Sequence, residues 1–314
     1  MNASSVIVIV LQGGLLVLGA PLVRGAIKKI KARLQNRVGP PLLQGYYDLV
    51  KLFQKESMAS VHSSFIFQMT PLVVFGVSVT VALLVPVLFS FSPFASFGDI
   101  IFIVYLLGLS VFFLVLAGLD TGSAFGGMGS AREMMIYSLS EPAMMLVIFT
   151  LAVANGTTQL TGIVSGAISE PQAIFLISNV FAFFAFFIVA LAENARIPVD
   201  NPATHLELTM VHEAMILEYS GRQLAFIEWA SAIKLTVFLA LLVTVFFPFG
   251  IATEFAGPAI ILAFVLFAVK IGFAIVAIAF VESTIAKLRL FRLPDFLGIA
   301  VVLSVIALFS SFFL

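Results

Sequence analysis

Eight long apolar runs constrain the fold of this chain more than any other feature of its sequence. A run of about 18 or more apolar residues is long enough to cross a bilayer as one helix. The chain is 61% hydrophobic and 10% charged, whereas soluble domains carry about 25% charged residues. We therefore predict an all-α integral membrane protein in which residues 1–314 form a single polytopic domain. The eight predicted spans are Ser4–Val23, Phe65–Phe91, Ile100–Leu119, Met134–Ala154, Ala173–Ala192, Gln223–Phe247, Pro258–Val281 and Phe296–Leu314.

The basic residues lie on alternate connections between these runs. All of the 16 except Lys234 and Lys270, which fall inside runs, follow the first, third, fifth or seventh run. Because basic loops stay in the cytoplasm, this pattern places both termini outside. The first run is followed by basic residues and not by a small-residue cleavage site, so we interpret it as a retained span.

Two of the cytoplasmic connections have a pattern of their own. Between residues 24 and 56 we expect a loop, broken at Gly39-Pro40-Pro41, whose second half repeats Leu42, Leu49, Leu52 and Phe53 at helical spacing. This predicts an amphipathic helix at the membrane surface or against a partner. Residues 120–133 are rich in Gly and Ser, which is typical either of a flexible turn or of a backbone that approaches another group closely. The lysine of a phosphate-binding loop is missing there.

Charged residues within predicted spans are costly and usually face a cavity or a partner. Glu141, followed by a proline, is either a hydrogen-bonded structural residue or a proton-carrying group. Glu228 and Lys234 are six residues apart, about 240° around an ideal helix, so each needs a partner on another element. Lys234 is then either a relay group or the counter-ion of a nearby glutamate.

The residues from 193 to 222 concentrate acids at the edge of this apolar bundle. The five carboxylates are Glu193, Asp200, Glu207, Glu213 and Glu218. Their mutual repulsion raises some of their pKa values and eases protonation, although a solvated acidic loop is the simpler alternative. Prolines at 198 and 202 disfavour a helix before Ala203, and a helix is plausible from Ala203 to Tyr219.

The residue types exclude several kinds of site. The two histidines of this stretch, His205 and His212, are seven residues apart, which is not the spacing of a helical zinc pair, and we predict no metal site. The chain has no cysteine. It therefore cannot bind an iron–sulfur cluster through thiolates, and any electron carrier must belong to another subunit.

Several motifs carry a resemblance that covers nearly the whole chain. They are Arg33-Leu-Gln-Asn-Arg37 with Gly39-Pro40; Asp48-Leu-Val-Lys51-Leu-Phe; Arg132 with Glu141 nine residues later; Glu193, Arg196, Pro198, Asp200 and Pro202; Glu207-Leu208; Glu218-Tyr-Ser-Gly221; and Glu282-Ser-Thr-Ile-Ala-Lys-Leu-Arg289. The chain resembles the subunit 1 family of respiratory complex I. It is still more similar to the family's counterpart in energy-converting nickel–iron hydrogenases and formate hydrogenlyase-type complexes.

The resemblance implies eight spans and a role in moving protons away from a redox-coupled cavity. The implied relay residues are Glu141, Glu193, Asp200, Glu207, Glu213, Glu218, Glu228 and Lys234. The implied charge partners and docking residues are Arg33, Arg37, Asp48, Lys51, Arg132, Glu133 and Arg196. The implied partners are hydrogenase-like large and small subunits, an iron–sulfur subunit and antiporter-like membrane subunits in a prokaryotic plasma membrane. Iron–sulfur clusters and a nickel–iron site would lie in those partners, and nothing indicates binding of nucleic acid.

Two departures point to the hydrogenase branch. The first cytoplasmic loop lacks the second Gly-Pro turn of the quinone-reducing branch. The amino-acid sequence from Glu207 to Glu213 also differs from the sequence in that branch. Both differences argue against a bound quinone. We therefore expect a membrane anchor that has no redox centre of its own and couples a hydrogenase arm to H⁺ or Na⁺ translocation. A quinone-reducing complex I-like enzyme and a stand-alone ion transporter are the alternatives.

Overall fold

The computed structural model describes residues 3–60, 63–90, 98–170, 172, 176–201, 210–253 and 257–313, with side chains from residue 7 onward. Within these residues the regular structure is helical, apart from two isolated β-bridges. The helices are α1 (Ala3–Leu34), α2 (Gln44–Phe53), α3 (Phe65–Leu84), α4 (Ile100–Asp120), α5 (Ala124–Asn155), α6 (Leu160–Ser169), α7 (Ile177–Glu193), α8 (His212–Ile216), α9 (Gly221–Phe246), α10 (Gly257–Thr284), the 3₁₀ turn η2 (Leu290–Arg292) and α11 (Leu293–Phe313).

Seven of these described helices are long and apolar enough to cross a membrane: α1, α3, α4, α5, α9, α10 and α11. This makes the chain a multi-pass membrane protein, as the apolar runs predict. The predicted fifth span corresponds to α7, which is apolar but only 17 residues long. The total of eight spans and the placement of both termini outside therefore stay predictions.

Two helices extend beyond the predicted spans. The segment from Arg24 to Leu34 continues α1, so the prediction of a loop starting at Arg24 is wrong. The helix persists because its apolar positions, such as Ile27, remain buried while Lys31 bonds to Glu282 of α10.

The Gly-rich stretch before the predicted fourth span is the first part of α5 and not a flexible turn. Ser123 caps this helix by accepting the backbone N–H of Gly126. A Cβ at Gly126 would lie 2.3 Å from the carbonyl oxygen of Gly118, and one at Gly129 would lie 2.8 Å from the Cβ of Ala214. The small residues thus allow α5 to approach α4 and α8 closely.

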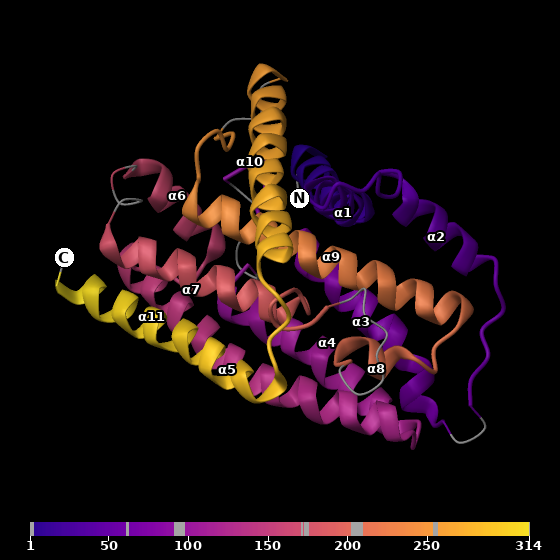
Figure 1. Cartoon of the computed structure of the whole chain (residues 1–314). Helices are drawn as coiled ribbons and strands as arrows, with labels where there is room; N and C mark the ends of the chain where they lie inside the picture. Colours follow the sequence, from indigo (N-terminus) through magenta and orange to yellow (C-terminus); the bar gives the residue numbers. More distant parts are fainter. Residues whose placement is uncertain are drawn as a thin grey trace.

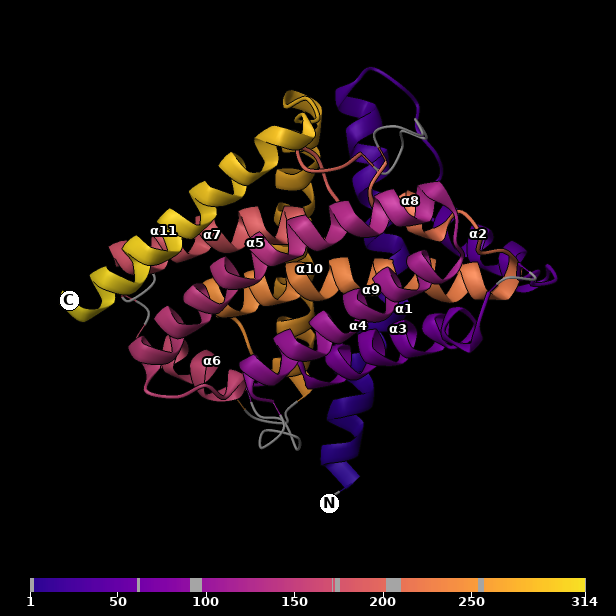
Figure 2. The ribbon, with the colours of Figure 1, turned by 90° about the horizontal axis from the view of Figure 1, so that it is seen from below.

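The helices form a tilted bundle in which the central helix is α9. Figure 1 shows α5, α7 and α11 running together while α10 stands steeply across them, and Figure 2 shows α1 and α10 crossing the remaining helices. The most apolar window of α9 is 83% buried, against 22% for α11. Glu228 and Lys234, in the middle of α9, therefore lie largely inside the bundle, whereas much of α11 is left for lipid or a partner.

The connections gather at two opposite ends of the bundle. At one end Ser64 bonds to Asp120, Met58 to Ser220 and Lys287 to Asp200. At the other end Thr158 bonds to Asp99, and the backbone of Ser90 bonds to that of Ala252. The basic connections thus meet at one end, as the charge pattern predicts.

The predicted amphipathic helix after the first span is present as α2. It packs against α1 and α9. The Phe53 ring meets the rings of Phe226 and Trp229 edge-on, with centroids 5.3 and 6.4 Å apart. Asp48 and Lys51 of α2 are exposed.

Candidate functional site

Glu228 and Lys234 of α9 form ion pairs with different helices, as their spacing predicts. Glu228 pairs with Arg24 of α1. Lys234 Nζ lies 2.9 Å from Glu193 Oε2 at the end of α7. Glu193 also accepts a hydrogen bond of 2.5 Å from Ser140 Oγ of α5. Lys234 of α9 and Ser140 of α5 thus meet at the buried Glu193 carboxylate of α7.

A second set of buried charges joins the segment after α7 to α1 and α10. Glu282 of α10 is 4% exposed, and its two carboxylate oxygens bind different cations. Lys31 Nζ lies 3.0 Å from one oxygen, and Arg196 Nη1 lies 3.3 Å from the other. Burial lowers the pKa of the Arg196 guanidinium, while the Glu282 carboxylate acts to raise it. Sequence reasoning assigned Arg196 to the acids near it in the sequence, whereas its ion-pair partner lies on α10.

Asp200 binds two groups from segments that come later in the chain. Its carboxylate accepts Lys287 Nζ at 2.6 Å and the backbone N–H of His212 at 3.3 Å. Arg132 of α5 donates to the carbonyl oxygen of Met210 at 2.8 Å.

The prediction of a helix from Ala203 to Tyr219 is wrong, because residues 210 and 211 are not helical and α8 is only five residues long. The side chains of Asp200 and Arg132 form hydrogen bonds with the backbone N–H of His212 and the carbonyl oxygen of Met210, two groups that a longer helix would use for its own hydrogen bonds.

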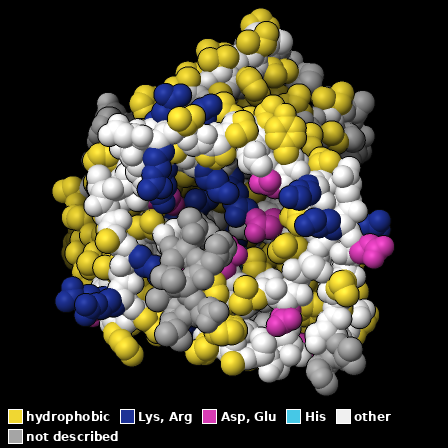
Figure 3. All heavy atoms as spheres, turned by 45° about the vertical axis from the view of Figure 1, so that its right-hand side comes forward, with side chains coloured by type: hydrophobic (Ala, Val, Ile, Leu, Met, Phe, Trp, Pro, Cys, Tyr) yellow, Lys and Arg dark blue, Asp and Glu magenta, His cyan; other side chains and the backbone are white. Residues whose placement is uncertain are grey.

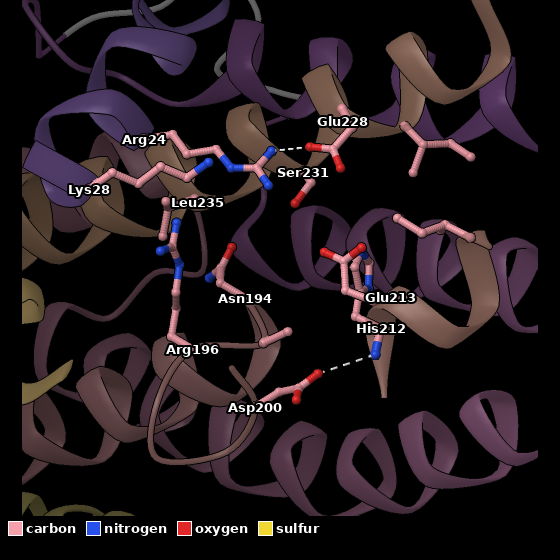
Figure 4. Close-up of a pocket in the computed structure, with 13 residues that line it drawn as sticks. Arg24, Lys28, Asn194, Arg196, Asp200, His212, Glu213, Glu228, Ser231 and Leu235 are labelled. Atoms are coloured by element: carbon pink, nitrogen blue, oxygen red, sulfur yellow. Dashed lines mark hydrogen bonds and ion pairs between the residues drawn. The ribbon is translucent and has the colours of Figure 1, made fainter. Parts of the chain in front are cut away.

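Two small cavities lie beside these ion pairs. The first has a volume of about 30 Å³, and its charged lining is Arg24, Lys28, Arg196, Asp200, Glu213 and Glu228. Figure 4 shows the basic side chains of α1 and Arg196 on one side of it and Glu213 and Glu228 on the other. The second has a volume of about 40 Å³ and is lined by Glu133, Glu193 and Lys234. Both cavities are lined by Asn194, His212 and Ser231. Each has room for water and polar groups that would bind it.

A larger cavity of about 380 Å³ lies beneath α2. It shares Arg24, Lys28, Glu213 and Glu228 with the first cavity and adds apolar side chains such as Leu49 and Leu52. Charged groups therefore extend from this cavity, past the first, to the Lys234–Glu193 pair.

The remaining predicted residues are distributed around this network. Glu141 is half-buried in α5, and Glu218 is exposed beyond α8. Glu133, predicted as a docking residue, lines the second cavity instead. Glu207 and His205 lie outside the described residues. The predicted docking residues Arg33, Arg37, Asp48 and Lys51 are all exposed, and Figure 3 shows a face on which Lys, Arg, Asp and Glu side chains gather around a hollow.

Sequence reasoning missed five charged members of the network: Arg24, Lys28, Lys31, Glu282 and Lys287. The first three were read only as a topology signal. Their spacing of four and three residues, which places them along one face of a continued helix, was the available signal. Glu282 stood in a motif of the resemblance, and its pairing with two cations was visible only in the fold.

His212 gives this site a predictable pH dependence. Burial lowers the pKa of its imidazole, and the positive charge of Lys234 acts in the same direction. The unfolded chain therefore binds more protons than the folded protein just below the ordinary histidine pKa of about 6.5. We expect stability to fall as the pH drops from about 6.5 towards the lower folded-state pKa, and His212→Gln to weaken this dependence. Thermal unfolding in detergent across this range measures it; identical pH profiles for both proteins would contradict it.

Comparison with known proteins places the chain in a family. The family model described as NADH dehydrogenase matches residues 5–312. Formate hydrogenlyase subunit 4 from Escherichia coli (strain K12) is 35% identical over 289 residues, covering 91% of this chain and 92% of the relative. Hydrogenase-4 component C from the same organism is 34% identical over 278 residues, covering 88% and 87%. NADH-ubiquinone oxidoreductase chain 1 from Dictyostelium citrinum is 30% identical over 276 residues, covering 81% of each.

The same arrangement of helices occurs in a solved structure. A chain of the membrane-bound sulfane sulfur reductase, an archaeal respiratory membrane complex, has a TM-score of 0.80 and 20% identity, covering 96% of this chain and 99% of that one. This likeness concerns the fold alone. The family match over nearly the full length confirms the predicted resemblance: the chain is a multi-pass membrane protein that belongs to the NADH dehydrogenase family, with hydrogenase-complex subunits among its relatives.

Proposed function

We propose that this chain is the membrane anchor and proton-relay subunit of a multisubunit redox-driven ion pump. Its docked arm would be a hydrogenase with iron–sulfur clusters and a nickel–iron site, and the pumped ion H⁺ or Na⁺. The observation that carries the proposal is the row of acid–base pairs along water-sized cavities, from Arg24–Glu228 to Lys234–Glu193. Such groups inside an apolar bundle usually mark an ion pathway.

In this proposal a redox change in the docked arm changes how many of the acidic side chains are protonated at the end of the bundle where the basic connections meet. A proton moves through water in the first cavity past Asp200, Glu213 and Glu228. It then reaches Glu193, where Lys234 and Ser140 hold the carboxylate. Moving one charge against about 100 mV costs about 2.3 kcal/mol. A pKa shift of about two units supplies about 2.7 kcal/mol.

The predicted partners fit this arrangement. The exposed basic residues Arg33 and Arg37 and the outer face of α2 would receive the hydrogenase-like large, small and iron–sulfur subunits. The lipid-facing helices would receive antiporter-like subunits in a prokaryotic plasma membrane. We further propose that α7 crosses the membrane as the eighth span, which places both termini on the same side, and the distribution of basic residues assigns that side as the outside. The iron–sulfur clusters and the nickel–iron site would belong to the partner chains.

The second candidate is the quinone-chamber subunit of a complex I-like enzyme, and the cavity beneath α2 favours it. Its volume of about 380 Å³ and mixed apolar and charged lining suit an amphiphile. The two inner cavities, at about 30 and 40 Å³, suit water and not a quinone ring. Stoichiometric nickel in the purified complex would support the hydrogenase; bound quinone without nickel would support the alternative.

The relay is tested by Glu193→Gln in the intact complex. This change keeps the side-chain shape but removes the proton-carrying group. Removing the partner of Lys234 costs stability, but we expect the complex still to assemble and reduce soluble dyes, while ion transport into membrane vesicles is lost. Glu218→Gln is the matched control because Glu218 is exposed and outside both inner cavities. Normal ion transport by Glu193→Gln would refute the relay, and loss in Glu218→Gln would extend the path to the surface.

A further inference from the structure

One face of α5 carries four polar side chains in a row: Glu133, Tyr137, Ser140 and Glu141. They fall within about 100° of one another around an ideal helix. Such a row inside an apolar bundle is costly unless its members contact one another or other polar groups.

The inner part of this row belongs to the ion-pair network. Glu133 lines the second cavity together with Glu193 and Lys234. Ser140 donates to one oxygen of Glu193, and Lys234 binds the other. Glu193 is thus fixed beside the face of α5 on which Tyr137 lies.

Tyr137 lies between this network and Glu141. Its side chain is half-buried and lies one helical turn from both Ser140, which binds Glu193, and Glu141. The carboxylates of Glu141 and Glu193 are both near enough to interact with it electrostatically. The neighbouring helix α4 has a glycine at this point. A Cβ at Gly108 would lie 2.3 Å from the Tyr137 hydroxyl oxygen, so a larger residue would displace the hydroxyl.

The outer part of the row leads to the flank of α4 and α5. Glu141 is half-buried, and Tyr105 of α4, which also interacts with Tyr137, is 57% exposed. The Tyr137 hydroxyl therefore lies between a buried carboxylate and one that reaches towards the surface.

We propose that the Tyr137 hydroxyl is the link that passes protons from Glu193 to Glu141; this rests on the proton relay proposed above. The protonated Glu193 carboxyl gives its proton to the Tyr137 oxygen as Tyr137 gives its own proton to the Glu141 carboxylate. One O–H bond breaks and one forms at the tyrosine, which stays neutral. Gly108 acts as a positioning residue by leaving space for the hydroxyl.

The first test is Tyr137→Phe in the intact complex, which removes only the hydroxyl. We expect dye-linked redox activity to be unchanged and ion transport per electron to fall about 100-fold, the lower range for a positioned proton-transfer group. A role in packing alone would lower assembly and redox activity together. Wild-type transport by Tyr137→Phe would overturn the proposal.

The second test displaces the hydroxyl without touching Tyr137. Gly108→Ala should reduce ion transport in the same way. Gly76→Ala of α3 is the matched control, because a Cβ there has no neighbour within 4 Å. In the Tyr137→Phe background, Gly108→Ala should cause no further loss, since the clashing oxygen is gone. A full, additive loss in the double variant would overturn the link.

The two proposals fail in different ways. If Glu193→Gln transports ions normally, the relay itself is wrong. If Glu193→Gln loses transport while Tyr137→Phe keeps it, the relay stands and the tyrosine link is wrong.

Discussion

Replacing Lys234 by methionine should lower the free energy of unfolding by about 3–5 kcal/mol, because it leaves the Glu193 carboxylate buried without its cation. The Glu193 side chain is only 3% exposed and that of Lys234 is 14% exposed, so bulk solvent does not reach the carboxylate to replace the lost cation. Denaturant-induced unfolding in detergent micelles measures the effect. Ion transport should be lost together with stability, since Lys234 holds the receiving carboxylate in place.

The double variant Glu193→Gln/Lys234→Met is the control for this prediction. Breaking a buried pair costs more than replacing both partners by neutral groups of similar size. We therefore expect the double variant to recover most of the stability that Lys234→Met loses, while ion transport stays lost. Equal stability of the single and double variants would show that Glu193 is not a buried charge that depends on Lys234.

Replacing Glu282 by glutamine should also cost about 3–5 kcal/mol, because one carboxylate neutralises two cations from different elements. Without it, Lys31 and Arg196 face each other across a neutral amide in the protein interior. We expect the segment from Asn194 to Asn201 to loosen, which unfolding curves and proteolysis of this segment would detect.

Two control variants, with smaller expected losses of stability, test whether the effect of Glu282→Gln comes from its two ion pairs. Lys31→Met should cost less, because Arg196 still pairs with Glu282. Glu170→Gln should be nearly neutral, because Glu170 is exposed and does not belong to this network. If Glu282→Gln is no more harmful than Glu170→Gln, the shared carboxylate does not hold these elements together.

The sequence predicted the membrane fold and much of the site from local properties. Apolar runs of spanning length predict α3, α4, α9, α10 and α11 to within a few residues, apart from the end of α3, because burial in lipid needs an apolar surface all round. The six-residue spacing of Glu228 and Lys234 excluded a pair between them, since the angle around a helix depends on spacing alone. The sequence also indicated the amphipathic α2.

Only the tertiary structure decided which charges meet. Arg24 and Glu228 are 204 residues apart, Lys31 and Glu282 are 251 residues apart, and Arg196 and Glu282 are 86 residues apart. No local pattern encodes such pairs, because they depend on how tilted helices pack. The same holds for the start of the short α8: the backbone N–H of His212 bonds to Asp200, and the carbonyl oxygen of Met210, just before the helix, accepts from Arg132. Hydrophobicity acts on each segment by itself, whereas a buried charge is stabilised only by the partner that the whole fold brings to it.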